Sequence, residues 1–185
     1  MSDGHYNILF LSNRNTVRSI FAEAVANHLG QGHFNGFSAG MNPAQRVDPQ
    51  VLDVLRGARY PVSGLRPKHW REFAKPDAPR LDFVFTLCDP VAGEPLPHWS
   101  GRPITADWRY PDPASLSGEK WEQRKALARI LVGLERQFRA FTQLPFKSLD
   151  DISLQARLAE LTEQNTRWGR AARSEESPSA PPLLG

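Results

Sequence analysis

A chain of 185 residues suits one domain of ordinary size, with a core of its own, rather than two full domains. Its 23 basic and 20 acidic residues are mixed along the sequence, so the net charge of +3 is not the footprint of a nucleic-acid-binding protein. Because no apolar run approaches the roughly 20 residues that span a membrane and no secretory leader is recognisable, we expect a cytoplasmic protein without a membrane partner.

Strand and helix patterns alternate over the first 75 residues. A run of apolar strand formers at 6–11 predicts a buried strand. After a loop, apolar residues at helical spacing predict a helix over 19–29 that stops at Gly30. The next predicted elements are a strand at 34–40, a helix at 48–55 capped by Asp48, a turn with a short extended piece at 57–62, and one or two helical turns at 67–74.

The second half continues this alternation and ends in a polar tail. Strands are predicted at 81–87 and 103–106. An amphipathic pattern over 117–141 predicts a long helix that covers one face of the sheet, and a further helix is predicted at 149–161. We therefore expect one α/β domain over 1–165, with a parallel sheet covered on both faces, and a disordered tail over 166–185.

The loop between the first strand and the first helix has the features of an anion-binding site. It runs from Ser12 to Arg18, at the carboxyl end of a parallel strand, where its backbone N–H groups and the helix N-terminus can converge on one point. Arg18 offers a planar fork for two oxygens of a tetrahedral anion, and Asn15 tolerates a left-handed backbone. The alternative is an ordinary strand-to-helix junction in which Asn and Ser form a turn and cap the helix.

Several separated motifs resemble the low-molecular-weight protein tyrosine phosphatases and their relatives, the thioredoxin-coupled arsenate reductases. The resemblance covers residues 6 to 160 and is greatest for the arsenate reductases. It implies a three-layer α/β fold in which a four-stranded parallel sheet has helices on both faces. The motifs that carry it, in family order, are NILFLSNRNTVRSIFAEA at 7–24, FSAG at 37–40, FTLCD at 85–89 and WRYPDPA at 108–114.

The chain departs from this pattern at the position of the nucleophile. The family carries a cysteine there, held as a thiolate by the helix N-terminus and the nearby arginine, whereas this chain has Ser12. A serine hydroxyl needs an adjacent base. His5 lies seven residues back along a strand, or about 23 Å away at roughly 3.3 Å per residue, so it cannot serve. His98 is the remaining candidate, and its alternative is a solvated loop residue.

Two further positions correspond to chemistry in the family. The resemblance gives Asp112 the place of the general acid that protonates a leaving oxygen, although an aspartate between two prolines is also an ordinary turn residue. It gives Cys88 the place of the second thiol in an arsenate-reducing relay. The third thiol is replaced by Leu96, so the relay cannot run within this chain. Cys88 can equally be a plain residue at a strand end.

These observations predict an oxyanion-binding protein related to phosphatases that has lost its cysteine chemistry. Phosphate, arsenate or a phosphoester is the expected ligand, and no cofactor or metal is expected because one cysteine and scattered histidines form no ligand set. The alternatives are a hydrolase that uses Ser12 with His98, and an interaction module with a purely structural loop; the protein partner is unknown. The expected oxyanion-binding residues are Ser12, Asn13, Arg14, Asn15, Thr16, Val17, Arg18 and Ser19.

Overall fold

The computed structural model describes residues 5–88, 99, 101–111, 118–146, 148 and 150–174. Four parallel strands form one sheet in the order β2-β1-β3-β4. They are β1 (Tyr6–Ser12), β2 (Phe34–Gly40), β3 (Phe83–Thr86) and β4 (Ile104–Asp107). The helices are α1 (Arg18–Leu29), α2 (Pro49–Gly57), the 3-10 helix η1 (Trp70–Phe73), α3 (Lys120–Thr142) and α4 (Asp151–Ser174).

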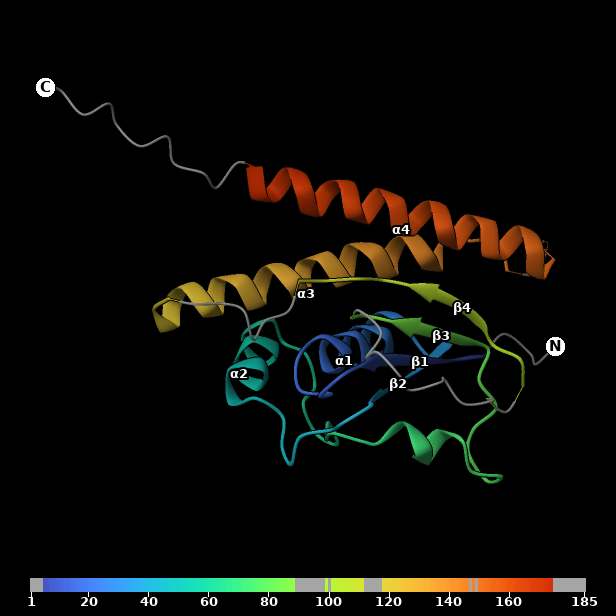
Figure 1. Cartoon of the computed structure of the whole chain (residues 1–185), viewed down its shortest axis with the longest axis horizontal. Helices are drawn as coiled ribbons and strands as arrows, with labels where there is room; N and C mark the ends of the chain where they lie inside the picture. The colour runs from blue at the N-terminus through green and yellow to red at the C-terminus, as the bar shows by residue number, and fades with distance from the viewer. Residues whose placement is uncertain are drawn as a thin grey trace, which may run out of the picture.

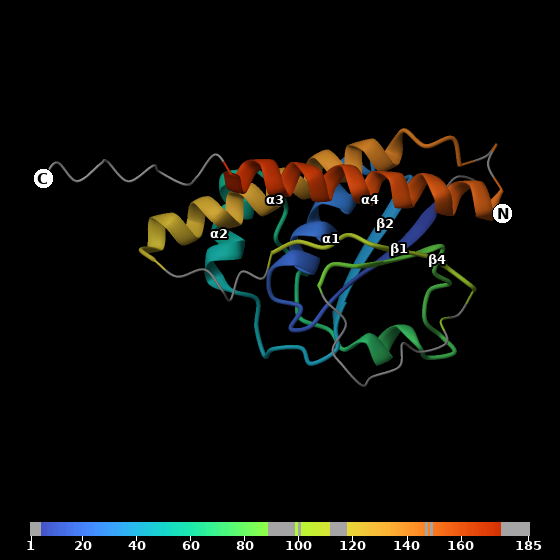
Figure 2. The ribbon, with the colours of Figure 1, turned by 45° about the horizontal axis from the view of Figure 1, so that its top comes forward.

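Alternating side chains of β1 are buried on opposite faces of the sheet, which produces three layers. Ile8 and Phe10 belong to the larger core cluster, which includes residues of α1, α3 and α4. Leu9 and Leu11 belong to a second cluster, which Phe73 of η1 completes on the other face. Figures 1 and 2 show α3 and α4 on one side of the sheet and η1 on the other. The predicted α/β fold with helical cover on both faces is confirmed.

The order of the strands places the carboxyl end of β1 at a topological switch point. In the sheet β2 lies on one side of β1 and β3 lies on the other. The loops that follow these neighbouring strands therefore extend in different directions from Ser12. The register pairs Ser12 with Gly40 on β2 and Leu11 with Thr86 on β3. Open parallel sheets bind ligands in the crevice that forms at such a point.

Most predicted elements occur where their patterns place them. Gly30 follows the end of α1, and the Asp48 side chain accepts a hydrogen bond from the backbone N–H of Gln50 at the start of α2. At the turn and short extended piece that we expected over 57–62, residues 58–59 form a turn and residues 60–62 belong to no strand of the sheet. Within the described ranges, no helix combines the length and the apolarity needed to cross a bilayer.

The last helix is longer than the predicted 149–161. Helix α4 continues to Ser174, into the range that we expected to be a disordered tail. Alanine and arginine, which have high helix propensity, make up five of the nine residues 166–174 and favour this continuation. The remainder of the predicted tail, 175–185, lies outside the described residues.

Candidate functional site

The loop from Ser12 to Arg18 connects the end of β1 directly to the start of α1. Asn15 adopts the left-handed conformation that its residue type tolerates, with φ at 50°. Val17 is the N-cap of α1, and no side chain in the described part of the chain caps this helix through a hydrogen bond. The first backbone N–H groups of a helix have no partner within the helix, so this terminus can donate to an external acceptor.

Backbone hydrogen bonds on the outer side of the loop orient its peptide groups. The carbonyl oxygens of Ser12, Asn13 and Arg14 accept from the N–H groups of Met41, Asn42 and Ala44 at 3.1, 2.9 and 3.0 Å. In a trans peptide the carbonyl and the following N–H point in opposite directions. The N–H groups of residues 13–15 are therefore turned toward the inner side of the loop, where an anion would lie.

The Ser12 hydroxyl is held by two polar groups at the base of the loop. Ser12 Oγ accepts from the backbone N–H of Asn15 at 3.2 Å and lies 2.7 Å from Ser19 Oγ. Ser19 Oγ also accepts from Asn15 Nδ2 at 2.8 Å, and Ser19 is fully buried. Either hydroxyl can be the donor in the Ser12–Ser19 pair, and with Ser19 as the donor the Ser12 hydrogen is available to a ligand in the loop.

A second layer of buried polar residues fixes Asn15. Asn15 Nδ2 also donates to Ser38 Oγ at 2.8 Å, and the Ser38 hydroxyl donates to Glu23. Glu23 receives the ammonium group of Lys68 at 2.9 and 3.1 Å. The backbone N–H of Lys68 donates to Asn15 Oδ1 at 2.7 Å, so the hydrogen bonds return to their starting point. These side chains, all buried, form a closed ring around Asn15.

Sequence reasoning did not identify this ring. Lys68 lies 53 residues from Asn15 and 45 from Glu23, and no local pattern marks a lysine as buried. Asn15 and Glu23 lie in the matched motif at 7–24 and Ser38 lies in the matched FSAG motif, but neither motif indicates that these side chains meet.

An exposed ion pair lies beside Lys68. The guanidinium of Arg66 contacts both carboxylate oxygens of Glu72, at 3.2 and 2.8 Å. The hydrogen bond from Arg66, followed by the positive charge of Arg66 and of Lys68, lowers the pKa of the Glu72 carboxyl below its ordinary value. The same hydrogen bond raises the pKa of Arg66. Glu72 therefore stays ionised close to the segment that supports Asn15.

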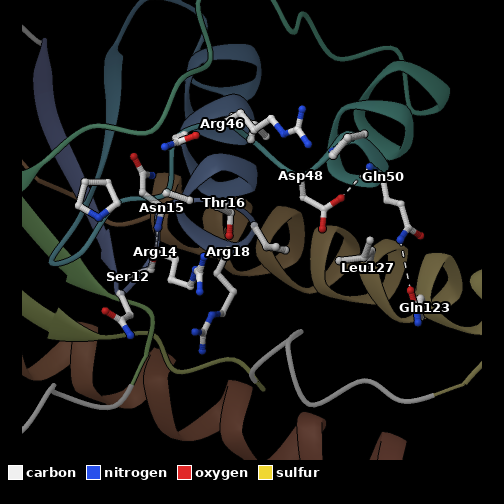
Figure 3. Close-up of a pocket in the computed structure, with 17 residues that line it drawn as sticks. Ser12, Arg14, Asn15, Thr16, Arg18, Arg46, Asp48, Gln50, Gln123 and Leu127 are labelled. Atoms are coloured by element: carbon white, nitrogen blue, oxygen red, sulfur yellow. Dashed lines mark hydrogen bonds between the residues drawn. The ribbon is translucent and has the colours of Figure 1, made fainter.

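Arg14 and Arg18 give the loop its positive charge. Arg18 is half-buried, and its Nη1 donates to the backbone carbonyl of Tyr110 at 3.0 Å, which ties the loop to the segment after β4. Arg14 is exposed. In Figure 3 both side chains extend to the same side of the loop. This side opens into a cleft of about 820 Å³ that residues 12–18, residues 43–50, Gln123 and Leu127 line.

The other residues that the sequence analysis considered for chemical roles either lie outside the described residues or do not line the cleft. Asp112, His98 and Leu96 lie outside the described residues. Cys88 is a buried cysteine two residues after β3 that forms no disulfide, and it is not among the described residues that line the cleft. His5 precedes β1, at the opposite end of the strand from Ser12. The described part of the chain contains no group of three or more His, Cys, Asp or Glu side chains that could hold a metal ion.

Comparisons with known proteins match the same part of the chain. A family model described as low molecular weight phosphotyrosine protein phosphatase matches residues 7–151, from β1 to the first residue of α4. A glutaredoxin arsenate reductase from Synechocystis sp. is 30% identical over 112 residues, which make up 60% of this chain and 82% of that protein. The range matched by the family model includes residues of all four strands and the Ser12–Arg18 loop.

Two solved structures resemble the fold. An arsenate reductase in the phosphate binding state superposes with a TM-score of 0.53 and 26% identity, covering 71% of this chain and 98% of its own. The arsenate reductase from Archaeoglobus fulgidus superposes with a TM-score of 0.54 and 26% identity, covering 70% of this chain and 96% of its own.

Proposed function

This chain belongs to the low molecular weight phosphotyrosine protein phosphatase family, and we propose that its Ser12–Arg18 loop binds a phosphate- or arsenate-type oxyanion without cysteine-based catalysis. The inward N–H groups of the loop, the uncapped N-terminus of α1 and the Arg18 side chain support the binding site. The phosphate binding state of a similar arsenate reductase supports phosphate as one ligand.

The proposal that the loop binds an oxyanion without turnover rests on the hydrogen-bond partners of the Ser12 hydroxyl. Among the described residues, Ser12 Oγ forms hydrogen bonds with Asn15 and Ser19, and neither of these can act as a general base. A neutral hydroxyl has no appreciable ionised fraction at neutral pH. A thiolate at this position would repel an incoming dianion a few ångströms away, but the hydroxyl does not and can donate a hydrogen bond.

Calorimetric titration with phosphate and arsenate, together with an assay of aryl phosphate turnover, tests the proposal. Binding of both anions without turnover is the expected result. Turnover by the wild type that disappears in His98→Ala would replace the proposal with a serine–histidine hydrolase. If neither anion binds and no turnover occurs, the loop is a structural element of an interaction module.

A further inference from the structure

The residues that line the cleft beyond the loop indicate the chemical class of the ligand to which the bound oxyanion belongs. We infer that this ligand is a non-aromatic phosphoester or phosphoanhydride with a second anionic group, an inference that rests on the proposed oxyanion site. Three properties of the cleft support it: its size, the excess of basic over acidic side chains among its described lining residues, and the chemistry of those residues.

The cleft is larger than one tetrahedral anion requires. Its volume of about 820 Å³ falls within the range of roughly 300–1,000 Å³ that is typical of sites for whole small molecules. Two walls enclose it. The Ser12–Arg18 loop forms one wall, and the segment 43–50, with Gln123 and Leu127 of α3, forms the other. A ligand whose oxyanion occupies the loop therefore has room to extend along the second wall.

Positive charge along the cleft exceeds what one oxyanion needs. Arg18 belongs to the loop, whereas the side chains of Arg14 and Arg46 are exposed and, within the described part of the chain, have no ion pair or hydrogen bond. Among the described lining residues Asp48 is the one acid, and its Oδ1 accepts the backbone N–H of Gln50 at 2.8 Å as the cap of α2. Figure 3 shows Arg46 on the other side of Thr16 from Arg14 and Arg18. A second anionic group would complement this excess.

The walls do not suit an aromatic ring. None of the described residues that line the cleft is aromatic, so none of them offers an aryl group a flat apolar surface to stack against. The second wall instead presents amides: Gln50 Nε2 donates to Gln123 Oε1 at 3.2 Å, as the dashed line in Figure 3 marks. Amide side chains can donate to phosphate oxygens and to hydroxyl groups.

Calorimetric titration with three probes tests the inference: inorganic phosphate, pyrophosphate and phenyl phosphate, at constant ionic strength and with EDTA to remove divalent cations. For the wild type we expect pyrophosphate to bind about tenfold more tightly than phosphate, and phenyl phosphate no more tightly than phosphate. Arg46→Gln should remove most of the difference in affinity between pyrophosphate and phosphate, and it should change the affinity for phosphate by less than about twofold.

Arg80→Gln is the matched control because it removes the same charge from an exposed arginine that precedes β3, at the opposite end of the strands. It should preserve the preference for pyrophosphate. Equal affinity for the two inorganic anions, or an equal preference in both variants, overturns the inference while leaving the proposed function intact. Tighter binding of phenyl phosphate than of phosphate overturns the non-aromatic assignment. If neither inorganic anion binds, both the inference and the proposed function fail.

Discussion

Lys68 is connected to Asn15 by one direct hydrogen bond from its backbone and by a chain of hydrogen bonds through two other side chains. Its N–H donates to Asn15 Oδ1 at 2.7 Å, and its ammonium group reaches the other end of the same amide through Glu23 and Ser38. Every polar atom of the Asn15 amide is thereby occupied. Because Asn15 is the left-handed residue of the loop, this ring fixes the backbone at the point where the N–H groups converge.

Removal of the Lys68 ammonium group should destabilise the protein strongly. Lys68→Met leaves the Glu23 carboxylate buried without its cation, and loss of one partner of a buried pair typically costs about 3–5 kcal/mol of unfolding free energy. Chemical denaturation measures this. The exposed Lys75→Met is the control and should have little effect. Adding Glu23→Gln to Lys68→Met should recover part of the loss; a double variant no more stable than Lys68→Met would contradict the ion-pair explanation.

Gly40→Ala should disturb the loop from the side of β2. A Cβ atom at residue 40 would lie 2.7 Å from the carbonyl oxygen of Asn13 and 3.1 Å from Asn15 Cβ, so the loop backbone must move. We expect a loss of about 1–3 kcal/mol in unfolding free energy and weaker phosphate binding. Gly57→Ala is the control, since its Cβ would meet only the Arg124 side chain at 3.7 Å. Equal behaviour of the two variants in thermal melts and titrations would refute the close contact.

Arg18→Ala should weaken phosphate binding by roughly a hundredfold, because it removes a charged donor from the anion site. Arg18→Lys separates charge from geometry: it retains the positive charge but loses the planar fork and the 3.0 Å hydrogen bond to Tyr110. We expect an intermediate affinity for the lysine variant in calorimetric titrations. Equal protection of the wild type and Arg18→Ala by phosphate in thermal melts would show that Arg18 is not part of the site.

Ser12→Cys should introduce measurable turnover of an aryl phosphate. The N–H of Asn15 donates to the Oγ position and the hydroxyl of Ser19 lies 2.7 Å from it, so both can donate to a thiolate there and stabilise it, aided by the N-terminus of α1. Asp112→Asn in this background should slow turnover by about 10²–10⁴-fold if Asp112 is the general acid. Arsenate reduction should stay absent because Leu96 replaces a relay thiol. A Ser12→Cys protein that binds phosphate yet is inert would exclude a latent phosphatase site.

Acid should weaken the ion pair of Arg66 and Glu72. The folded-state pKa of Glu72 is lowered, so its stabilising contribution is present above the ordinary glutamate pKa of about 4.3 and is lost as the pH falls through the folded value. The pair is largely exposed, so we expect at most about 0.5 kcal/mol. In urea denaturation, Glu72→Gln should be slightly less stable than the wild type at pH 7, with the difference gone at pH 3. A difference that persists at pH 3 would point to packing instead.

The parts of the site that are local in sequence were predictable. The apolar run of β1, the helical spacing of α1 and the polar residues between them are consecutive, so their periodicity and residue types predicted a loop at a strand end with Asn15 in a left-handed conformation. The identity of Ser12 excluded cysteine chemistry at this position without any coordinates. The domain fold followed from the alternation of strand and helix patterns.

Long-range packing determined the rest. Lys68, Glu23 and Ser38 meet around Asn15 because β1 and β2 are adjacent and the chain after α2 returns along the edge of β2, where Gly40 and Lys68 share a backbone hydrogen bond. Arg46 and Gln123 line the same cleft as the loop because α2, which follows Arg46, packs against α3. No residue pattern encodes these distances, since hydrophobic periodicity specifies which face of an element is buried but not which charged group of another element lies opposite it.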